Sequence, residues 1–323
     1  MKSHKQLTYE QRCQIEALKK SGISQQAIAT LIGVNQSTVS RELSRNTGLR
    51  GYRHNQAQRK SIERRQNTVK PHKMTPELID EIDDKLLLKW SPEQISGWLL
   101  VNQNIGISHE TIYRYVWANK SAGGDLYKHL RRGTRKYKTR GSNGKTRRGQ
   151  IKNRVSIDER PLLVDEKSRV GDWEIDTVIG KNHRGALVTI VERVTLFTVS
   201  MRVKSKRAKE VTAATLALLM PFKSLVRTIT SDNGKEFAYH EEIAATLECD
   251  FYFAHAYHSW ERGLNENTNG LLRQYFPKST DFKTVSAKAV KQSIDELNNR
   301  PRKTLAFKTP TALMQIEMAA LIA

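Results

Sequence analysis

Three carboxylates in separate sequence motifs constrain the fold of this chain more than any other feature. They are Asp176 in GDWEIDTVIG, Asp232 in ITSDNGKEF and Glu266 in GLNENTNGLL. The apolar residues around Asp176 predict a strand, those before Asp232 predict a strand that ends there, and the segment around Glu266 predicts a helix. Acidic residues are a minority, with 33 Asp and Glu against 55 Lys and Arg. We therefore expect a fold that brings two strands and one helix together around an anionic site.

From about residue 158 the pattern alternates between strands and helices. Strands are predicted over 173–179, 186–194, 198–203, 225–230 and 251–253, and helices over 208–220, 239–247, a segment reaching 272, and 284–299. Three antiparallel strands, then a helix, a parallel strand, a helix and a strand, followed by helices, is the order of an α/β RNase H-like catalytic domain, which we place at 158–323. In this fold the strand that ends at Asp232 is adjacent to the strand of Asp176, and the helix of Glu266 can pack across the sheet.

Carboxylates arranged in this way are suited to metal-dependent chemistry on phosphodiesters. Side chains alternate along a strand, so Asp172, Glu174 and Asp176 share one face, and only the spacing to the other two motifs selects Asp176. Carboxylate and phosphate oxygens favour Mg²⁺, for which Mn²⁺ can substitute, and two ions at one site would bracket the scissile phosphate. A single such motif more often marks a solvated surface, whereas three in this order predict a catalytic site.

The balance of charge indicates a polyanionic partner. The formal net charge is +22 over 323 residues, which favours nucleic acid over a merely solvated basic surface. Cys13 and Cys249 are too few for a multi-cysteine zinc site and suggest no disulfide framework, as expected in a reducing cytoplasm. The N-terminus lacks the apolar run of a signal peptide, and no stretch approaches the ~18 apolar residues of a membrane span. We therefore expect a cytoplasmic protein.

Residues 1–48 are predicted to form an all-α helix-turn-helix DNA-binding domain. A helix capped by Thr8 is followed by a short helix over 24–32, a glycine turn and a second helix over 36–43. Leu31 is expected in the core of this domain. An ordinary helical hairpin is the alternative, but the polar outer face of the last helix favours contacts with base edges or phosphates. The side chains expected to contact DNA there are Gln36, Ser37, Thr38, Ser40, Arg41 and Arg45.

A second helix-turn-helix-like domain is predicted at 76–120, flanked by basic linkers at 49–75 and 121–157. Its helices share the order of the first domain but little residue identity, and its aromatic residues are expected in the core rather than in base stacking. Most of the linker at 121–157 is rich in Lys and Arg, free of acids and interrupted by Gly and Ser, which predicts a flexible segment. We expect this linker to contact DNA phosphates, through Arg131 and Arg132 among others.

Further polar residues lie close to Glu266 in the sequence. Arg262, Asn269 and Arg273 fall on the same helix face as Glu266 by their spacing. Arg273 is a candidate contact to a phosphate near the active site, and a surface salt bridge is an equal alternative.

Two histidines, His255 and His258, precede the predicted helix. A zinc pair, or a Ser259 nucleophile activated by His258, would require a third partner, and the sequence does not show one. A packing role for this loop near DNA is therefore the preferred interpretation.

Together these motifs resemble those of the insertion-sequence-30 family of bacterial transposases, a branch of the DDE transposases and retroviral-type integrases. The resemblance covers nearly the whole chain and rests on SRELSRN, GDWEIDTVIG, TSDNGKEF, ERGLNENTNGLLRQYFPK and NNRPRKTLAFKTP, of which the last four are specific and occur in family order. It implies that Asp176, Asp232 and Glu266 are the catalytic triad. The chain departs from the family pattern where Asp172 replaces a His and Ala306 replaces a Gly, both outside the triad.

The resemblance implies a transposase that binds the terminal inverted repeats of an insertion sequence through its helix-turn-helix domains. It would hydrolyse phosphodiesters at the transposon ends and then join the freed 3′-hydroxyl to target double-stranded DNA. Because two ends have to be held together, a homodimer or larger homo-oligomer is expected, acting at the bacterial nucleoid. One alternative is a sequence-specific transcription regulator whose RNase H-like domain only oligomerises, although all three carboxylates are present. A nuclease without strand transfer is a second alternative, and it would seldom need two DNA-reading domains.

Overall fold

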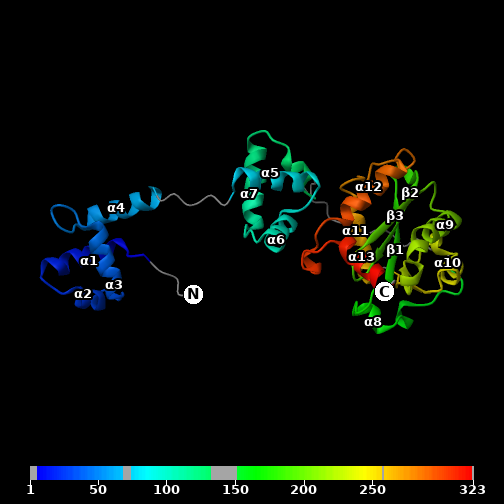
Figure 1. Ribbon diagram of the computed structural model, residues 1–323, viewed down its shortest axis with the longest axis horizontal. Coiled ribbons are helices and arrows are strands. Elements are labelled where there is room, and N and C mark those ends of the chain that lie inside the picture. The colour runs from blue at the N-terminus through cyan, green and yellow to red at the C-terminus, as the bar shows by residue number, and fades with distance from the viewer. Residues whose placement is uncertain (1–5, 68–73, 132–150, 257, 322–323) are drawn as a thin grey trace. The chain divides into compact units, whose positions relative to one another are not determined.

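The computed structural model describes residues 6–67, 74–131, 151–256 and 258–321 (Figure 1). The chain divides into two units, Met1–Lys73 and Met74–Ala323. The first unit contains α1 (Tyr9–Lys20), α2 (Gln25–Leu31), α3 (Gln36–Asn46) and α4 (His54–Asn67). The second contains a helical part and an α/β part. No helix among the described residues is long and apolar enough to cross a bilayer.

The N-terminal unit is a helix-turn-helix domain, as predicted, completed by a fourth helix. Thr8 forms a capping box with Gln11 at the start of α1, and the side chains of Ser24 and Asn35 cap α2 and α3. Gly33 turns the chain between α2 and α3 at a φ of +69°, a conformation that favours glycine. Local capping and turn chemistry therefore set the boundaries of the three predicted helices.

The structure corrects two expectations for this unit. Leu31 is 65% exposed rather than buried, because Ile28 and Ala29 form the core-facing side of α2 and Leu31 lies roughly 110° around the helix from the middle of that side. The segment at 49–75, expected to be a linker, contains α4, which packs against α1 and α3. The only residue that α4 buries is Ala57, so its sequence carries no apolar stripe that would predict a packed helix.

The helical part of the second unit consists of α5 (Pro76–Leu87), α6 (Pro92–Gln103) and α7 (His109–Ser121). Proline occupies the first helical position of α5 and α6, where its missing N–H costs nothing. Ile112 and Val116 are buried in its core, whereas Trp117, expected there as well, is 45% exposed. A 3-10 helix at Leu126–His129 contacts α5 and α7, so the segment at 121–157 is not a linker throughout.

The α/β part is built on one mixed five-stranded sheet. Its strands are β1 (Asp172–Ile179), β2 (Ala186–Glu192), β3 (Thr198–Val203), β4 (Thr228–Ser231) and β5 (Asp250–Phe253). They lie in the order β3-β2-β1-β4-β5. The β1–β2 and β2–β3 pairs are antiparallel, whereas the β1–β4 and β4–β5 pairs are parallel. The predicted RNase H-like order is confirmed, and so is the adjacency of the strand that contains Asp176 and the strand that precedes Asp232.

The two faces of the sheet are covered by different helices (Figure 1). Trp173 and Ile175 of β1 join the core formed with α9 (Ala208–Leu219) and α10 (His240–Leu247). The alternate residues of β1 face α11 (Gly263–Leu272), and α12 (Ala287–Asn298) shares the apolar core on that side. The period of two along β1 therefore separates an apolar face from a face that carries the carboxylates.

Several boundaries in this part differ from the predicted ones. The fourth strand begins at Thr228, because Met220–Leu225 form a 3-10 helix instead of extended chain. Two helices were not predicted, α8 (Leu162–Asp165) and α13 (Pro310–Ala320), so α12 is not the last helix. Ala306 has a φ of 51°, which explains why glycine suits this position in the family that the sequence resembles.

Candidate active site

Asp176 lies on the central strand β1 with its carboxylate at the surface of the sheet. Its side chain is 25% exposed. Asn269 on α11 donates from Nδ2 to Oδ2 of Asp176 at 2.9 Å, and the backbone N–H of Thr177 donates to Oδ1 at 2.8 Å. The carboxylate is therefore oriented by two donors while it keeps access to solvent.

Asp232 follows β4, the strand parallel and adjacent to β1. The backbone N–H of Gly234 donates to its Oδ1 at 2.8 Å. A Cβ at Gly234 would lie 2.4 Å from a carboxylate oxygen of Glu236, so a larger residue here would displace the Glu236 side chain. The guanidinium of Arg262 lies 3.8 Å from Oδ1 of Asp176 and 3.6 Å from Oδ2 of Asp232. Two carboxylates far apart in the sequence thus share one cationic neighbour.

Glu266 occupies the first turn of α11, and it is exposed. The residue before it, Asn265, connects α11 to β1 by two hydrogen bonds. Its N–H donates to Oε2 of Glu174 and its Nδ2 donates to the carbonyl of Glu174, both at 3.0 Å. Asn269, which bonds Asp176, is three residues after Glu266 and therefore lies on a neighbouring position of the helix surface. The structure brings the helix that carries Glu266 against the strand that carries Asp176.

The electrostatics of the site favour a bound cation. Burial raises the pKa of Asp176 to about 6, the positive charge of Arg262 opposes this shift, and the negative charge of Asp232 adds to it. A divalent cation would neutralise this unfavourable concentration of negative charge. The candidate ligands are all carboxylate oxygens, which suit a hard divalent ion.

The other two carboxylates of GDWEID are buried in ion pairs. Asp172 accepts from Nε of Arg169 at 3.1 Å and from Oγ1 of Thr228 at 2.8 Å. Glu174 accepts from Nη1 of Arg193 at 2.7 Å as well as from the backbone of α11, and burial raises its pKa. Only Asp176 of the three keeps its carboxylate at the surface. The contact of Glu174 with α11 was not predicted from the sequence, although an acidic residue within an apolar strand indicates a carboxylate with a specific partner.

The remaining residues predicted near this site have varied surroundings. Arg262 ends a 3-10 helix, Ser259–Arg262, immediately before α11 and is not part of the helix face of Glu266. Arg273 donates to the carbonyl of Ile179 at 3.1 Å, and Arg131 donates to Oδ1 of Asn267 on α11 at 3.1 Å. Arg132 and most of the basic segment at 121–157 lie outside the described residues.

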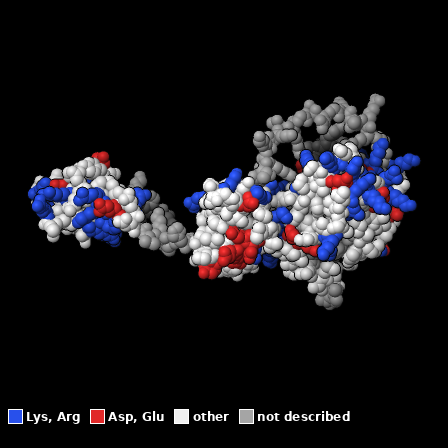
Figure 2. Space-filling model, turned by 90° about the horizontal axis from the view of Figure 1, so that it is seen from above, with Lys and Arg blue, Asp and Glu red and all other residues white. Residues whose placement is uncertain are grey.

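The helix predicted to contact DNA is α3 in the N-terminal unit. Gln36, Arg41 and Arg45 are exposed on it, whereas Ser37, Thr38 and Ser40 are half-buried. Figure 2 shows Lys and Arg side chains gathered on this unit. Arg41 and Arg45 line a cleft that they share with Arg64 and Arg65 of α4. Sequence reasoning missed the contribution of α4, because this helix was expected to be a linker.

A buried ion pair holds this helix in place. Nε of Arg12 on α1 donates to Oε1 of Glu42 on α3 at 2.9 Å, and the hydroxyl of Tyr52 donates to the same oxygen at 3.1 Å. Both members of the pair are more than nine-tenths buried. The orientation of α3 therefore depends on α1, because separating the pair would leave an unpaired charge in the core.

Two family models match parts of the chain. A model described as a helix-turn-helix domain matches residues 3–46, which include α1 to α3. A model described as an integrase core domain matches residues 167–259, which include all five strands. An integrase core implies dependence on divalent metal ions in general, in agreement with the cluster of Asp176 and Asp232.

Curated relatives resemble the chain over nearly its whole length. It is 48% identical to the transposase for insertion sequence element IS4351 of Bacteroides fragilis, over 95% of this chain and 94% of the relative. It is 35% identical to the transposase InsI for insertion sequence element IS30C of Escherichia coli (strain K12), over 96% of this chain and 83% of the relative. It is also 35% identical to the transposase for insertion sequence element IS1086 of Cupriavidus metallidurans, over 96% of this chain and 94% of the relative.

The matches show that this one chain contains both a helix-turn-helix domain and an integrase core. They do not favour a transcription regulator. The sheet order and the paired carboxylates provide the structural counterpart of the matches. The chain therefore belongs to the insertion-sequence-30 family of transposases, which are DDE-type polynucleotidyl transferases.

Proposed function

We propose that Asp176, Asp232 and Glu266 form the catalytic triad of this transposase and hold two Mg²⁺ ions, for which Mn²⁺ can substitute. The observation that carries the proposal is the approach of Asp176 and Asp232 to one guanidinium beside α11. When bound, the ions would activate the attacking water or 3′-hydroxyl and stabilise the leaving oxygen of the phosphodiester.

The residues around the triad would orient it. Asn269 fixes one oxygen of Asp176, and the contacts of Asn265 with Glu174 set the position of α11 and hence of Glu266. Arg262 reaches both aspartates and is placed to bind a phosphate oxygen when DNA enters the site. The reaction is hydrolysis at the transposon ends followed by attack of the freed 3′-hydroxyl on target DNA.

The N-terminal unit would recognise the terminal inverted repeats. Arg41 is the leading candidate for a contact with a base edge, because it is exposed on α3 beside the basic cleft shared with α4. Arg273 would contact a phosphate near the active site, and Arg131 and Arg132 would contribute further contacts to DNA phosphates. A homodimer or larger assembly would hold two ends together, and a DNA substrate implies action at the nucleoid in the bacterial cytoplasm.

The test is conservative substitution of each carboxylate. Asp176→Asn, Asp232→Asn and Glu266→Gln are each expected to abolish nicking of labelled repeat ends and strand transfer in Mg²⁺, because each removes one charge that the metal ions require. Binding of the repeat, measured by fluorescence anisotropy, should be unchanged. Glu242→Gln, at an exposed position of α10, removes one negative charge elsewhere and should leave both reactions intact. Robust cleavage by any of the three variants would remove that residue from the triad.

A further inference from the structure

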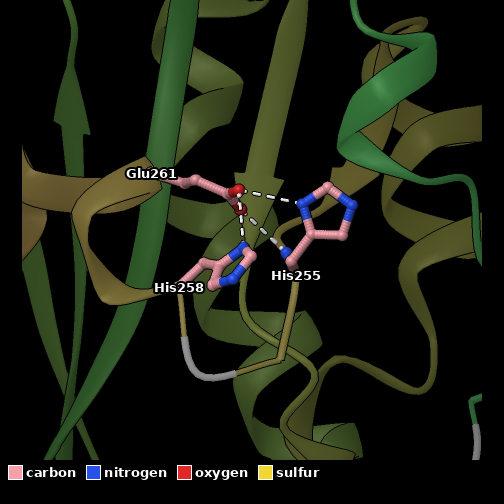
Figure 3. Close-up of side chains that lie close together, drawn as sticks. All are labelled: His255, His258 and Glu261. Atoms are coloured by element: carbon pink, nitrogen blue, oxygen red, sulfur yellow. Dashed lines mark hydrogen bonds and ion pairs between the residues drawn. The ribbon is translucent and has the colours of Figure 1, made fainter.

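Two histidines and a glutamate converge in the loop between β5 and α11 (Figure 3). Nδ1 of His255 lies 2.8 Å from Oε1 of Glu261, and Nδ1 of His258 lies 3.2 Å from the same oxygen. One ligand atom from each of the three residues lies within 4.8 Å of the others. Glu261 is the third partner that the sequence did not reveal, and the 3-10 helix at Ser259–Arg262 returns its side chain to the histidines.

The contacts of His255 require positive charge on or beside its imidazole. Its second ring nitrogen, Nε2, lies 3.0 Å from Oδ2 of Asp158, so both nitrogens of one imidazole face carboxylates. A neutral imidazole has one N–H, and one of these contacts would then oppose a nitrogen lone pair to a carboxylate oxygen. A protonated imidazole donates to both carboxylates, and a cation that replaces the Nδ1 proton satisfies the contact with Glu261 equally and leaves Nε2–H to donate to Asp158. A carboxylate that orients a histidine on a metal is a recurring arrangement in metalloproteins.

We propose that His255, His258 and Glu261 bind a divalent transition-metal ion, Zn²⁺ in particular, at a site distinct from the catalytic carboxylates. Two imidazole nitrogens and one carboxylate oxygen are a zinc donor set, whereas Mg²⁺ prefers oxygen alone. Ligand atoms of a tetrahedral zinc ion are roughly 3.3 Å apart for bonds of about 2.0–2.1 Å. The 3.2 Å between His258 and Glu261 matches this separation, and the 2.8 Å between His255 and Glu261 would widen by about half an ångström on binding. The histidine side chains are 40% and 42% exposed, so an ion and a water ligand can enter.

The position of this cluster gives the ion a structural consequence. At the start of the loop, the N–H of Ala254 donates to the carbonyl of Ser231 at 2.9 Å, and Nδ2 of Asn233 donates to the carbonyl of Ala254 at 2.6 Å. At its end, Glu261 directly precedes Arg262, the residue beside both aspartates. The ion would therefore stiffen the loop that joins the turn of Asp232 to Arg262 and α11. Its ligands are positioning residues, and the site does not depend on the proposed triad.

Metal titration of the full-length protein tests this proposal. The protein is stripped with a chelator and titrated with Zn²⁺ against a chromogenic competitor, with excess Mg²⁺ present to occupy the carboxylate site. The wild type should bind one equivalent of Zn²⁺, and Co²⁺ in its place should give the visible absorption of a four-coordinate ion. His258→Gln should lower the Zn²⁺ affinity by more than tenfold. Asp158→Asn, which removes only the partner of His255, should lower it by roughly tenfold.

Two matched variants separate this site from others. His109→Gln removes an exposed histidine 3.8 Å from a carboxylate of Glu110, and Asp176→Asn alters the catalytic site, so both should keep the wild-type Zn²⁺ affinity. If His258→Gln fails to fold by circular dichroism, Asp158→Asn decides, because its side chain is 69% exposed and is not a ligand. Absence of stoichiometric Zn²⁺ binding in the wild type, or unchanged affinity in the folded His258 and Asp158 variants, overturns the proposal. Loss of strand transfer in Asp176→Asn with Zn²⁺ binding retained would separate this site from the triad.

Discussion

The chain contains two three-helix segments of similar order, α1–α3 and α5–α7, and they differ in charge. Residues 6–67 include eleven Lys and Arg against four Asp and Glu, whereas residues 74–131 include six against eight. Figure 2 shows the same contrast, with acidic side chains gathered on the helical part of the second unit. Because affinity for DNA is dominated by phosphate contacts, a shared helix order does not imply a shared ability to bind it.

Their interiors differ as well. The N-terminal unit buries a complete ion pair, Arg12 with Glu42, whereas Asp83 of α5 accepts a hydrogen bond from the neutral hydroxyl of Tyr115 at 2.9 Å. The second segment also contacts the α/β part, through Lys303 and Glu93 at 2.6 Å. We infer that the first segment is specialised for recognising DNA and the second for packing against the catalytic part.

The largest expected effect follows from removing the buried acid of the first segment. Glu42→Ala leaves the charge of Arg12 unpaired in the core and should lower the free energy of unfolding of the N-terminal unit by about 3–5 kcal/mol. Chemical denaturation of the full-length protein measures this loss. Glu63→Ala, which breaks the exposed pair with Arg59 on α4, should cost less than about 1 kcal/mol. Equal costs for the two variants would contradict a structural role for the buried pair.

A second comparison concerns two arginines at equivalent positions in their helices. Arg41 is the sixth residue of α3 and Arg114 the sixth residue of α7, and both are exposed. Arg41→Ala should weaken binding of the terminal repeat by about 1–3 kcal/mol, as expected for a bidentate contact with a base. Arg114→Ala should change it far less. Anisotropy titrations with repeat and scrambled DNA at matched salt distinguish them, and a larger loss for Arg114 would reverse the assignment.

A smaller effect concerns the salt dependence of DNA binding. Arg45→Gln and Arg65→Gln, in the basic cleft, should each flatten the slope of log affinity against log salt by about 0.9 if each contacts one phosphate. Lys120→Gln, at an exposed position of α7, should leave the slope nearly unchanged. Equal slopes for all three variants and the wild type would show that the cleft does not follow the DNA backbone.

The smallest expected effect is a pH dependence confined to the second segment. Burial raises the pKa of Asp83, and the hydrogen bond from Tyr115 opposes this shift. The folded state therefore binds a proton more tightly than the unfolded state, so the stabilisation is complete below the unfolded pKa and is lost as pH rises through the folded pKa. Asp83→Asn should flatten this dependence in calorimetric scans across acidic pH, whereas Asp80→Asn, at an exposed position of α5, should not. A steeper profile in Asp83→Asn would contradict the assignment.

Much of the fold was predictable because its signals are local. Caps at Thr8, Ser24 and Asn35 mark helix starts through contacts within a few residues, and the alternation in GDWEID assigns β1 its two faces. The α4 helix and the exposure of Leu31 were not predictable. The packing of a short or polar helix depends on which neighbouring element covers it, and that element is formed by residues distant in the sequence.

The sequence by itself determined the order of the five strands and the motifs that carry Asp176, Asp232 and Glu266, because periodicity and motif spacing are properties of the chain. Only the tertiary structure decided what each polar group contacts. It buried Glu174 in a pair with Arg193 and placed Arg262 beside both aspartates. It also gave His255 and His258 a shared partner in Glu261. Burial and charge pairing depend on groups that meet only when the chain folds, so residues with the same sequence signal acquire different chemistry.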